Sequence, residues 1–194
     1  MVRKPTAERQ QEIEQAVLDL IATEGTQGLT MARIAARIGV SEAALYRHFH
    51  GKLDIIHATI EASFHRVMER LTQAAGRGDA TTRLHHVFVA QLQFIEHHPG
   101  MARILFSDEI HFNARELQRE LNAHIAKLLA FIANLLNAGV EHGQLASDLD
   151  VEAAAALYLG LIQTQLILWS VNGKTQRLTA RSEQLWALYM RALK

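Results

Sequence analysis

The chain has 194 residues, a hydrophobic fraction of 49 %, no cysteine, and equal numbers of basic and acidic residues. The lack of cysteine excludes disulfides, thiolate zinc sites and cysteine nucleophiles, and the zero net charge gives no general affinity for nucleic acid. An apolar content of this size can form a core, so we expect a folded protein rather than a disordered one.

The N-terminal residues lack the apolar segment of a secretory signal. The most apolar run, 151–171, carries Gln163, Thr164 and Gln165 in its middle. A membrane-spanning helix would rarely hold these three polar residues together. We therefore expect a cytoplasmic protein that has no contact with a membrane.

Helical spacing of apolar residues recurs along the whole chain, and no segment shows the alternation typical of a strand. Caps and helix breakers divide the chain into nine expected helices, so the predicted fold class is all-α. The expected helices cover about 6–24, 30–38, 42–49, 52–75, a segment that ends at 98, 100–106, 114–142, a segment from Asp148 or Asp150 to 171, and 178–193. In the first helix the expected buried residues are Ile13, Ala16, Val17, Leu20 and Ile21.

The second and third helices form a helix-turn-helix pattern. Thr30 and Ser41 are good N-cap residues, and Gly39 lies where the chain must turn sharply. Two short helices joined by a turn of three or four residues have the dimensions of this DNA-binding motif.

The third helix has an unusual outer face. On a helical wheel, Leu45 and Phe49 point toward the bracing helices, whereas Ala43 and Arg47 point away. Small side chains allow the backbone to approach a major groove, and an arginine can bind guanine or phosphate. The candidate DNA-binding residues are Thr30, Ser41, Glu42, Ala43, Ala44, Tyr46, Arg47, His48 and Lys52.

The segment SEAALYRHF, with a lysine three residues later, resembles the recognition helix of TetR-type (TetR/AcrR) transcriptional regulators. The resemblance implies an N-terminal three-helix DNA-binding domain at 1–51 and a helical regulatory and dimerisation domain at 52–194. It also implies that Tyr46 and Lys52 hold phosphates, that His48 contacts the backbone or a base edge, and that positions 42–44 and 47 read bases. Because the two alanines supply no hydrogen bond, specificity would depend on Glu42, Arg47 and DNA shape.

The helix at 151–171 is apolar almost all round, and such a helix must be buried on every side. We expect it to form a four-helix homodimer interface with the last helix, as the family resemblance also implies. A purely internal core helix is the alternative. The predicted interface residues are Leu157, Leu161, Leu168, Trp169, Trp186 and Tyr189.

The helices between 52 and 142 are expected to enclose a pocket for a small-molecule effector of unknown identity. Gln163 and Gln165 need hydrogen-bond partners, either on a ligand or on each other across a dimer. The helix that begins at Lys52 is the expected link between ligand and DNA. The candidate pocket residues are Phe64, Met68, His86, Phe88, Phe106, Phe131, Gln163 and Gln165.

The predicted function is therefore a DNA-binding transcriptional regulator, a ligand-responsive repressor that binds a double-stranded palindromic operator as a dimer. No cofactor, catalytic residue or metal ligand is predicted, and no motif has the spacing of an enzyme active site. A metal-responsive regulator is one alternative, because His57, Glu61 and His65 share a helical face; the spacing matches no specific metal motif.

A second alternative is a DNA-bound inhibitor of cell division. The segments VSEAALYRHF, TTRL and HPGMARIL look like parts of the nucleoid-occlusion branch of the same superfamily, which restrains the cell-division filament when bound to DNA. This likeness fades after about residue 135, and the apolar helix at 151–171 and the NGK turn look more like those of ordinary transcriptional repressors.

Overall fold

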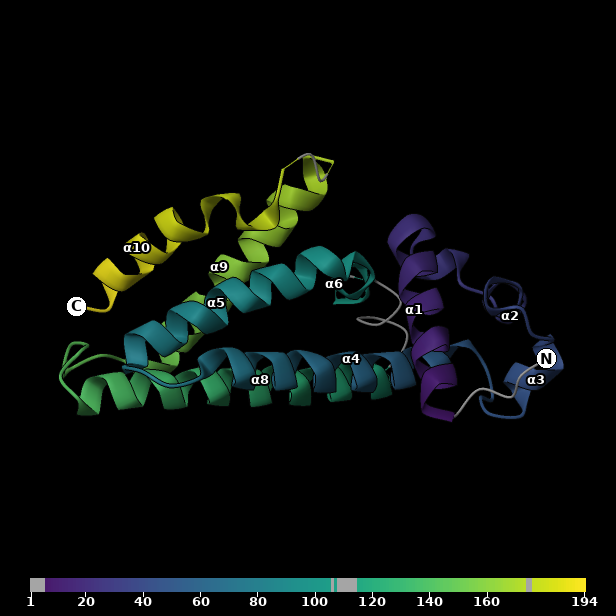
Figure 1. Cartoon of the computed structure of the whole chain (residues 1–194), viewed down its shortest axis with the longest axis horizontal. Helices are drawn as coiled ribbons and strands as arrows, with labels where there is room; N and C mark the ends of the chain where they lie inside the picture. The colour runs from purple at the N-terminus through teal and green to yellow at the C-terminus, as the bar shows by residue number, and fades with distance from the viewer. Residues whose placement is uncertain (1–5, 106, 108–114, 174–175) are drawn as a thin grey trace. The chain divides into compact units, whose positions relative to one another are not determined.

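A computed structural model describes residues 6–105, 107, 115–173 and 176–194. All elements within these residues are helical, which confirms the predicted fold class (Figure 1). The α-helices are α1 (Thr6–Glu24), α2 (Met31–Ile38), α3 (Glu42–Tyr46), α4 (Lys52–Ala75), α5 (Ala80–His97), α6 (Pro99–Leu105), α8 (Arg115–Glu141), α9 (Val151–Val171) and α10 (Ser182–Ala192), and two short 3₁₀ segments are η1 (Thr26–Gly28) and η2 (Leu178–Arg181).

Most helix ends lie within two residues of their predicted positions, with two exceptions. The last helix, α10, begins at Ser182, four residues later than predicted, because residues 178–181 form η2. The other exception is α3. It ends at Tyr46, three residues earlier than predicted. The backbone N–H of His48 donates to the carbonyl of Leu45 at 2.9 Å, which is the tighter hydrogen bond of a 3₁₀ turn. Arg47 and His48 therefore lie on a tightened last turn rather than in the helix.

The described residues pack into two compact units. The first unit contains residues 1–65 and 98–121, and the second contains 66–97 and 122–194. The first unit thus holds α6 and the first turns of α4 and α8 together with α1, α2 and α3. This division follows packing and differs from the predicted boundary between residues 51 and 52, which concerns function and remains a prediction.

In the first unit, α1 is covered on two sides. Val17 and Ile21 are fully buried as predicted, and Leu18 is buried as well, whereas Leu20 is only half-buried. The reason is that α6 packs against α1. Gly100 of α6 approaches so closely that a β-carbon added there would lie 2.1 Å from the carbonyl oxygen of Leu18.

In the second unit, an aromatic cluster joins three helices. Tyr158 of α9 makes edge-to-face contacts with Phe88 of α5 and Tyr189 of α10, with ring centroids 5.8 and 6.1 Å apart. The Tyr158 hydroxyl donates to Oε1 of Gln91 at 2.9 Å, and the Tyr189 hydroxyl donates to the Ala154 carbonyl at 2.8 Å. Burial raises the pKa of both tyrosines, so both hydroxyls remain protonated donors.

Replacing Tyr158 with phenylalanine is expected to destabilise the fold by about 1–3 kcal/mol, because the buried amide of Gln91 loses its hydroxyl donor. Urea unfolding followed by circular dichroism measures the loss. Tyr189→Phe is the matched control and should cost less, since the Ala154 carbonyl can still accept a hydrogen bond within α9. Equal losses for the two variants would contradict the role assigned to Gln91.

Candidate nucleic-acid interface

The turn between α2 and α3 is built around Gly39. Gly39 has a φ of 69° and caps α2 in the left-handed conformation, which glycine adopts without the steric cost that a β-carbon adds. Val40 donates its backbone N–H to the carbonyl of Ala35 at 3.0 Å, which completes the helix stop. The chain can therefore reverse direction and begin α3 only three residues later, at Glu42.

Side-chain hydroxyls cap both helices of the motif. Thr30 Oγ1 accepts a hydrogen bond from the Arg33 backbone N–H at 3.3 Å, and Ser41 Oγ accepts one from the Ala44 N–H at 3.2 Å. The predicted N-cap positions are thus confirmed. Each hydroxyl still has its own hydrogen to donate, and both residues are exposed, so both can donate to a phosphate.

The outer face of α3 lies open within its unit. Leu45 is 2 % exposed and holds α3 against the other helices, and Phe49 is half-buried. Tyr46 is 52 % exposed, an unusual position for a large aromatic ring. The other exposed residues of this face are Glu42, Ala43, Arg47 and His48, and Ala44 is half-buried at its edge.

The arginines of the motif differ in their partners. Arg33 pairs with Glu24, and Arg37 Nη2 lies 3.0 Å from Asp19 Oδ2, so α1 carboxylates offset both charges. Arg47 is exposed and makes no ion pair with another described residue. Its guanidinium therefore has all its donors available for a base or a phosphate. Lys52, half-buried, opens α4 directly after this surface.

The contact between α6 and α1 was not foreseen from the sequence. Arg103 Nη1 donates to the carbonyl of Ile21 at 3.4 Å, and the hydroxyls of Thr26 and Ser107 share a buried hydrogen bond of 2.9 Å. The Pro99-Gly100 pair indicated only a helix break. The end of α1 and the segment after it are thus braced by residues about 80 positions away along the chain.

Replacing Gly100 with alanine is expected to destabilise the protein by about 1–3 kcal/mol, because the new β-carbon would overlap the Leu18 backbone and force α6 away from α1. Chemical denaturation measures the effect. Gly51→Ala is the control, since a β-carbon there meets no atom within 4 Å. A Gly100→Ala protein as stable as the control would show that α6 can shift without cost.

The predicted dimer residues fall into three groups. Leu157 and Leu168 are 48 % and 51 % exposed. Leu161, Trp169 and Trp186 are half-buried, and Tyr189 lies in the core of its own chain at 2 % exposure. Three further apolar residues of the same two helices are exposed: Ile167 at 50 %, Val171 at 79 % and Leu188 at 53 %.

A single chain covers only one side of α9. The buried side carries Ala154, Ala155, Tyr158, Ile162 and Leu166. The exposed side carries the large apolar residues Leu157, Ile167, Leu168 and Val171, which argues against the alternative of a purely internal core helix. By length and composition alone, α8 and α9 could each cross a membrane, but Gln163 and Thr164 are exposed at the centre of α9.

The predicted pocket residues that lie in the second unit have different surroundings. Phe88 is fully buried in the aromatic cluster. His86 lines an open groove of about 640 Å³ with Arg70, His85 and Gln93. Gln165 lines a different groove of about 510 Å³.

The other predicted pocket residues have mixed exposure. Met68 and Phe131 are half-buried in the second unit, Phe64 is half-buried in the first unit, and Gln163 is exposed. Phe106 lies outside the described residues. The effector pocket therefore remains a prediction.

Comparison with protein families gives two matches. Residues 13–59 match the model described as bacterial regulatory proteins, tetR family. Residues 78–194 match the model described as tetracyclin repressor-like, C-terminal domain. Together the two matches include the helix-turn-helix motif, α5 and every described element after it.

Individual proteins show the same likeness. The nucleoid occlusion factor SlmA of Photobacterium profundum is 29 % identical over 182 residues, which is 93 % of each chain. The protein of the same name from Escherichia coli O1:K1 is 35 % identical over 140 residues, 70 % of this chain and 71 % of its own length. The likeness to these proteins thus extends past residue 135, where it was expected to fade.

Among solved structures, the transcriptional regulator FadR from Bacillus subtilis, in complex with stearoyl-CoA, has a TM-score of 0.84 at 22 % identity. The match covers 95 % of this chain and 99 % of that one. It supports the same helical fold.

Proposed function

The chain belongs to the tetR family of bacterial regulatory proteins and is a DNA-binding regulator, and we propose that two copies pair through α9 and α10 to repress transcription from a palindromic operator. The observation that carries this proposal is the open face of α3. The exposed Tyr46 and the unpaired Arg47 have no structural use on a free surface, whereas both suit a DNA groove.

The predicted roles follow from the position of each side chain. Arg47 and Glu42 read base edges, and the exposed methyl of Ala43 contacts a thymine methyl. Thr30 and Ser41 donate their hydroxyls to phosphates, and Tyr46, His48 and Lys52 hold the backbone. Because only Arg47 and Glu42 can form hydrogen bonds with base edges, part of the sequence specificity comes from DNA shape.

Pairing is required because one helix-turn-helix motif spans too few base pairs for useful specificity. The exposed apolar side of α9, with Leu157, Ile167 and Leu168, supplies the surface. Exposure of this much apolar surface to water is unfavourable. Packing against α9 and α10 of a second copy would bury this surface. An isologous pair of this kind has two-fold symmetry, which matches a palindrome.

Selection of bound duplexes from a random pool tests the proposal. We expect an enriched palindrome with half-sites about one helical turn apart, or a multiple of it. Enrichment of a single, unrepeated half-site would contradict dimeric readout. A pool that remains random after repeated rounds would contradict sequence-specific binding itself.

A small-molecule effector would control the repressor by preferring one of two conformations, and a coupling free energy of about 1–3 kcal/mol is typical. The contact between α6 and α1 is a direct route, because it joins the DNA-binding helices to a segment outside the motif. The stearoyl-CoA complex of the Bacillus subtilis protein makes acyl thioesters the first compounds to test. A melting-temperature rise together with release of DNA would identify an effector.

A second candidate function is nucleoid occlusion, which the relatives named SlmA favour. In this case the DNA-bound dimer would act on the cell-division filament rather than on a promoter. Sedimentation of the chain with a purified division-filament protein, with and without the selected DNA, separates the two functions. Co-sedimentation that depends on DNA supports nucleoid occlusion, and its absence leaves transcriptional repression.

A further inference from the structure

The open side of α9 is a regular stripe that runs from Ala153 to Val171. Its members are three or four positions apart, so they share one face of the helix. They are Ala153, Ala156, Leu157, Gly160, Thr164, Ile167, Leu168 and Val171, of which Gly160 is half-buried and the others are exposed.

The stripe has the same spacing when it is read from either end, with its centre level with Ile162. A two-fold axis at this level would place two antiparallel copies of α9 so that each member faces its counterpart. The counterparts are Ala153 and Val171, Ala156 and Leu168, Leu157 and Ile167, and Gly160 and Thr164. A small residue faces a larger one in every pair except Leu157 with Ile167, so the two surfaces can interdigitate.

Gly160, next to the centre of the stripe, has no evident use in a single chain. A β-carbon added there would meet no atom of a neighbouring element within 4 Å among the described residues. A glycine inside a helix destabilises it relative to alanine. Close approach of a second helix at this point would explain why the residue lacks a side chain.

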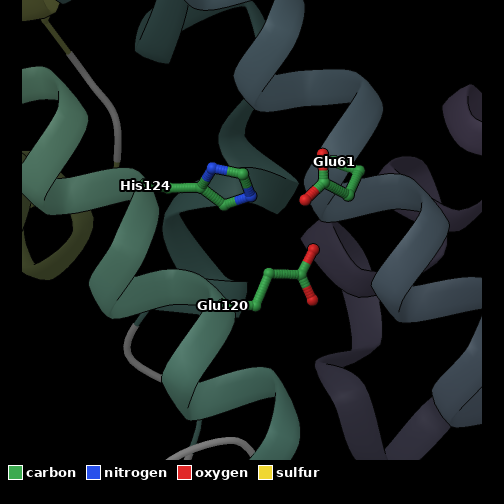
Figure 2. A group of neighbouring side chains, drawn as sticks. All are labelled: Glu61, Glu120 and His124. Carbon is green, nitrogen blue, oxygen red and sulfur yellow. The ribbon is translucent and has the colours of Figure 1, made fainter.

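Carboxylates in the first unit have a basic neighbour within the chain. Figure 2 shows the carboxylates of Glu61 and Glu120 close to each other, and Nε2 of His57 lies 3.2 Å from Oε2 of Glu120. The charged side chains at the two ends of α9, in the second unit, differ in this respect.

The two ends of α9 carry opposite charges. Asp148 and Glu152 are exposed at its start, and neither makes an ion pair with another described residue. Arg177 and Arg181 are also exposed and make no such pair, and both line the groove beside Trp169 at the other end of α9. An antiparallel pair would bring the basic end of each copy to the acidic end of the other.

We propose that α9 packs antiparallel against α9 of a second copy, with the two-fold axis level with Ile162 and with Arg177 and Arg181 beside the acidic end of the partner helix. This inference rests on the proposed dimer and adds its orientation and register. A crossing angle of about 20°, as in four-helix bundles, keeps the two stripes in contact along their length.

Disulfide cross-linking tests the register, because the chain has no cysteine of its own. Leu157→Cys and Ile167→Cys proteins are purified separately, mixed to exchange subunits, and oxidised. The mixture should form a disulfide-linked dimer faster than either protein alone, since the two thiols face each other. Two copies of the same thiol would lie about 15 Å apart along the helix, whereas a disulfide needs Cα atoms within about 7 Å.

Sedimentation of the same proteins under reducing conditions separates two kinds of failure. Equally fast cross-linking of either protein alone would overturn the register, as would the absence of cross-links in a mixture that sediments as a dimer. Both results would leave the dimeric repressor in place. A monomer in sedimentation would overturn the register and the proposed pairing together.

Gly160→Leu should weaken pairing by at least about 10-fold, because a large side chain between closely packed helices is unfavourable. The single chain should keep its fold, since leucine is a better helix former than glycine. Asn137→Leu adds the same side chain to an exposed position of α8 and should leave the dissociation constant of the dimer unchanged. Equal dissociation constants for the two variants would contradict the close approach at Gly160.

Charge reversal tests the contact between the two ends. Arg177→Glu combined with Arg181→Glu should cause a loss of dimer, because like charges would then face each other. Adding Asp148→Lys and Glu152→Lys to the same chain should restore pairing. A chain with all four changes that pairs no better than the doubly substituted one would contradict the antiparallel orientation.

Discussion

Replacing Arg47 with alanine is expected to weaken binding to the selected operator by about 1–3 kcal/mol and to reduce the preference for that sequence. The reason is that Arg47 is exposed on α3 and pairs with no other described residue. Tyr46→Ala and Lys52→Ala should instead weaken binding to all duplexes alike, since contacts with phosphates carry no sequence information. Fluorescence anisotropy with operator and scrambled duplexes measures both quantities.

Arg37→Ala is the matched control for Arg47→Ala. It removes the same charge from the same motif, but Arg37 is already held by Asp19 at 3.0 Å. We expect it to leave the preference for the operator intact. Unchanged binding in the Tyr46, Arg47 and Lys52 variants would contradict the proposed interface. Equal loss of preference in the Arg37 and Arg47 variants would remove the specific role of Arg47.

Replacing Leu168 with glutamate is expected to convert the dimer to a monomer and to lower operator affinity by about 100-fold or more. Leu168 is 51 % exposed in the single chain, so the substitution leaves the core unchanged. A carboxylate on this surface would have to be buried on pairing, and a monomer loses the gain from two linked half-site contacts. Sedimentation gives the oligomeric state, and anisotropy gives the affinity.

Leu53→Glu is the control for the sedimentation experiment. Leu53 is comparably exposed at 47 % but lies near the start of α4, outside the proposed dimer surface. The Leu53 variant should remain a dimer. A dimeric Leu168→Glu protein would mean that pairing uses another surface.

The sequence predicted which face of α3 is exposed, because that orientation depends on local patterns. Cap residues, Gly39 and the spacing of Leu45 from Ala43 and Arg47 are enough to orient α3. The resemblance of SEAALYRHF to a known family added the domain plan. The length of α3 was overestimated, since apolar spacing continues to Phe49 while the last turn tightens to a 3₁₀ turn.

Contacts between distant residues could not be predicted. The burial of Leu18 depends on Gly100, which lies 82 positions later in the chain. The spacing of apolar residues in α1 does not indicate that α6 covers a second side of this helix. Phe88 was predicted to line a pocket and Tyr189 to lie in the dimer interface, but both are buried in the core of the chain. Apolar spacing shows that a helix has a buried side but does not tell which neighbour that side faces. The histidine spacing drew attention to His57 and Glu61, but their neighbour Glu120 comes from a separate helix.

The most direct test of the central claim uses the absence of cysteine from the chain. Ala43→Cys places a single thiol on the exposed face of α3, where a DNA-cleaving iron chelate can be attached. Bound to the selected operator, this dimer should cut at two symmetric positions inside the half-sites, and Ser147→Cys, in the exposed turn before α9, should give no cuts there. Cleavage at a single position, or equal cleavage by both conjugates, would contradict the entry of α3 into two half-sites of one duplex.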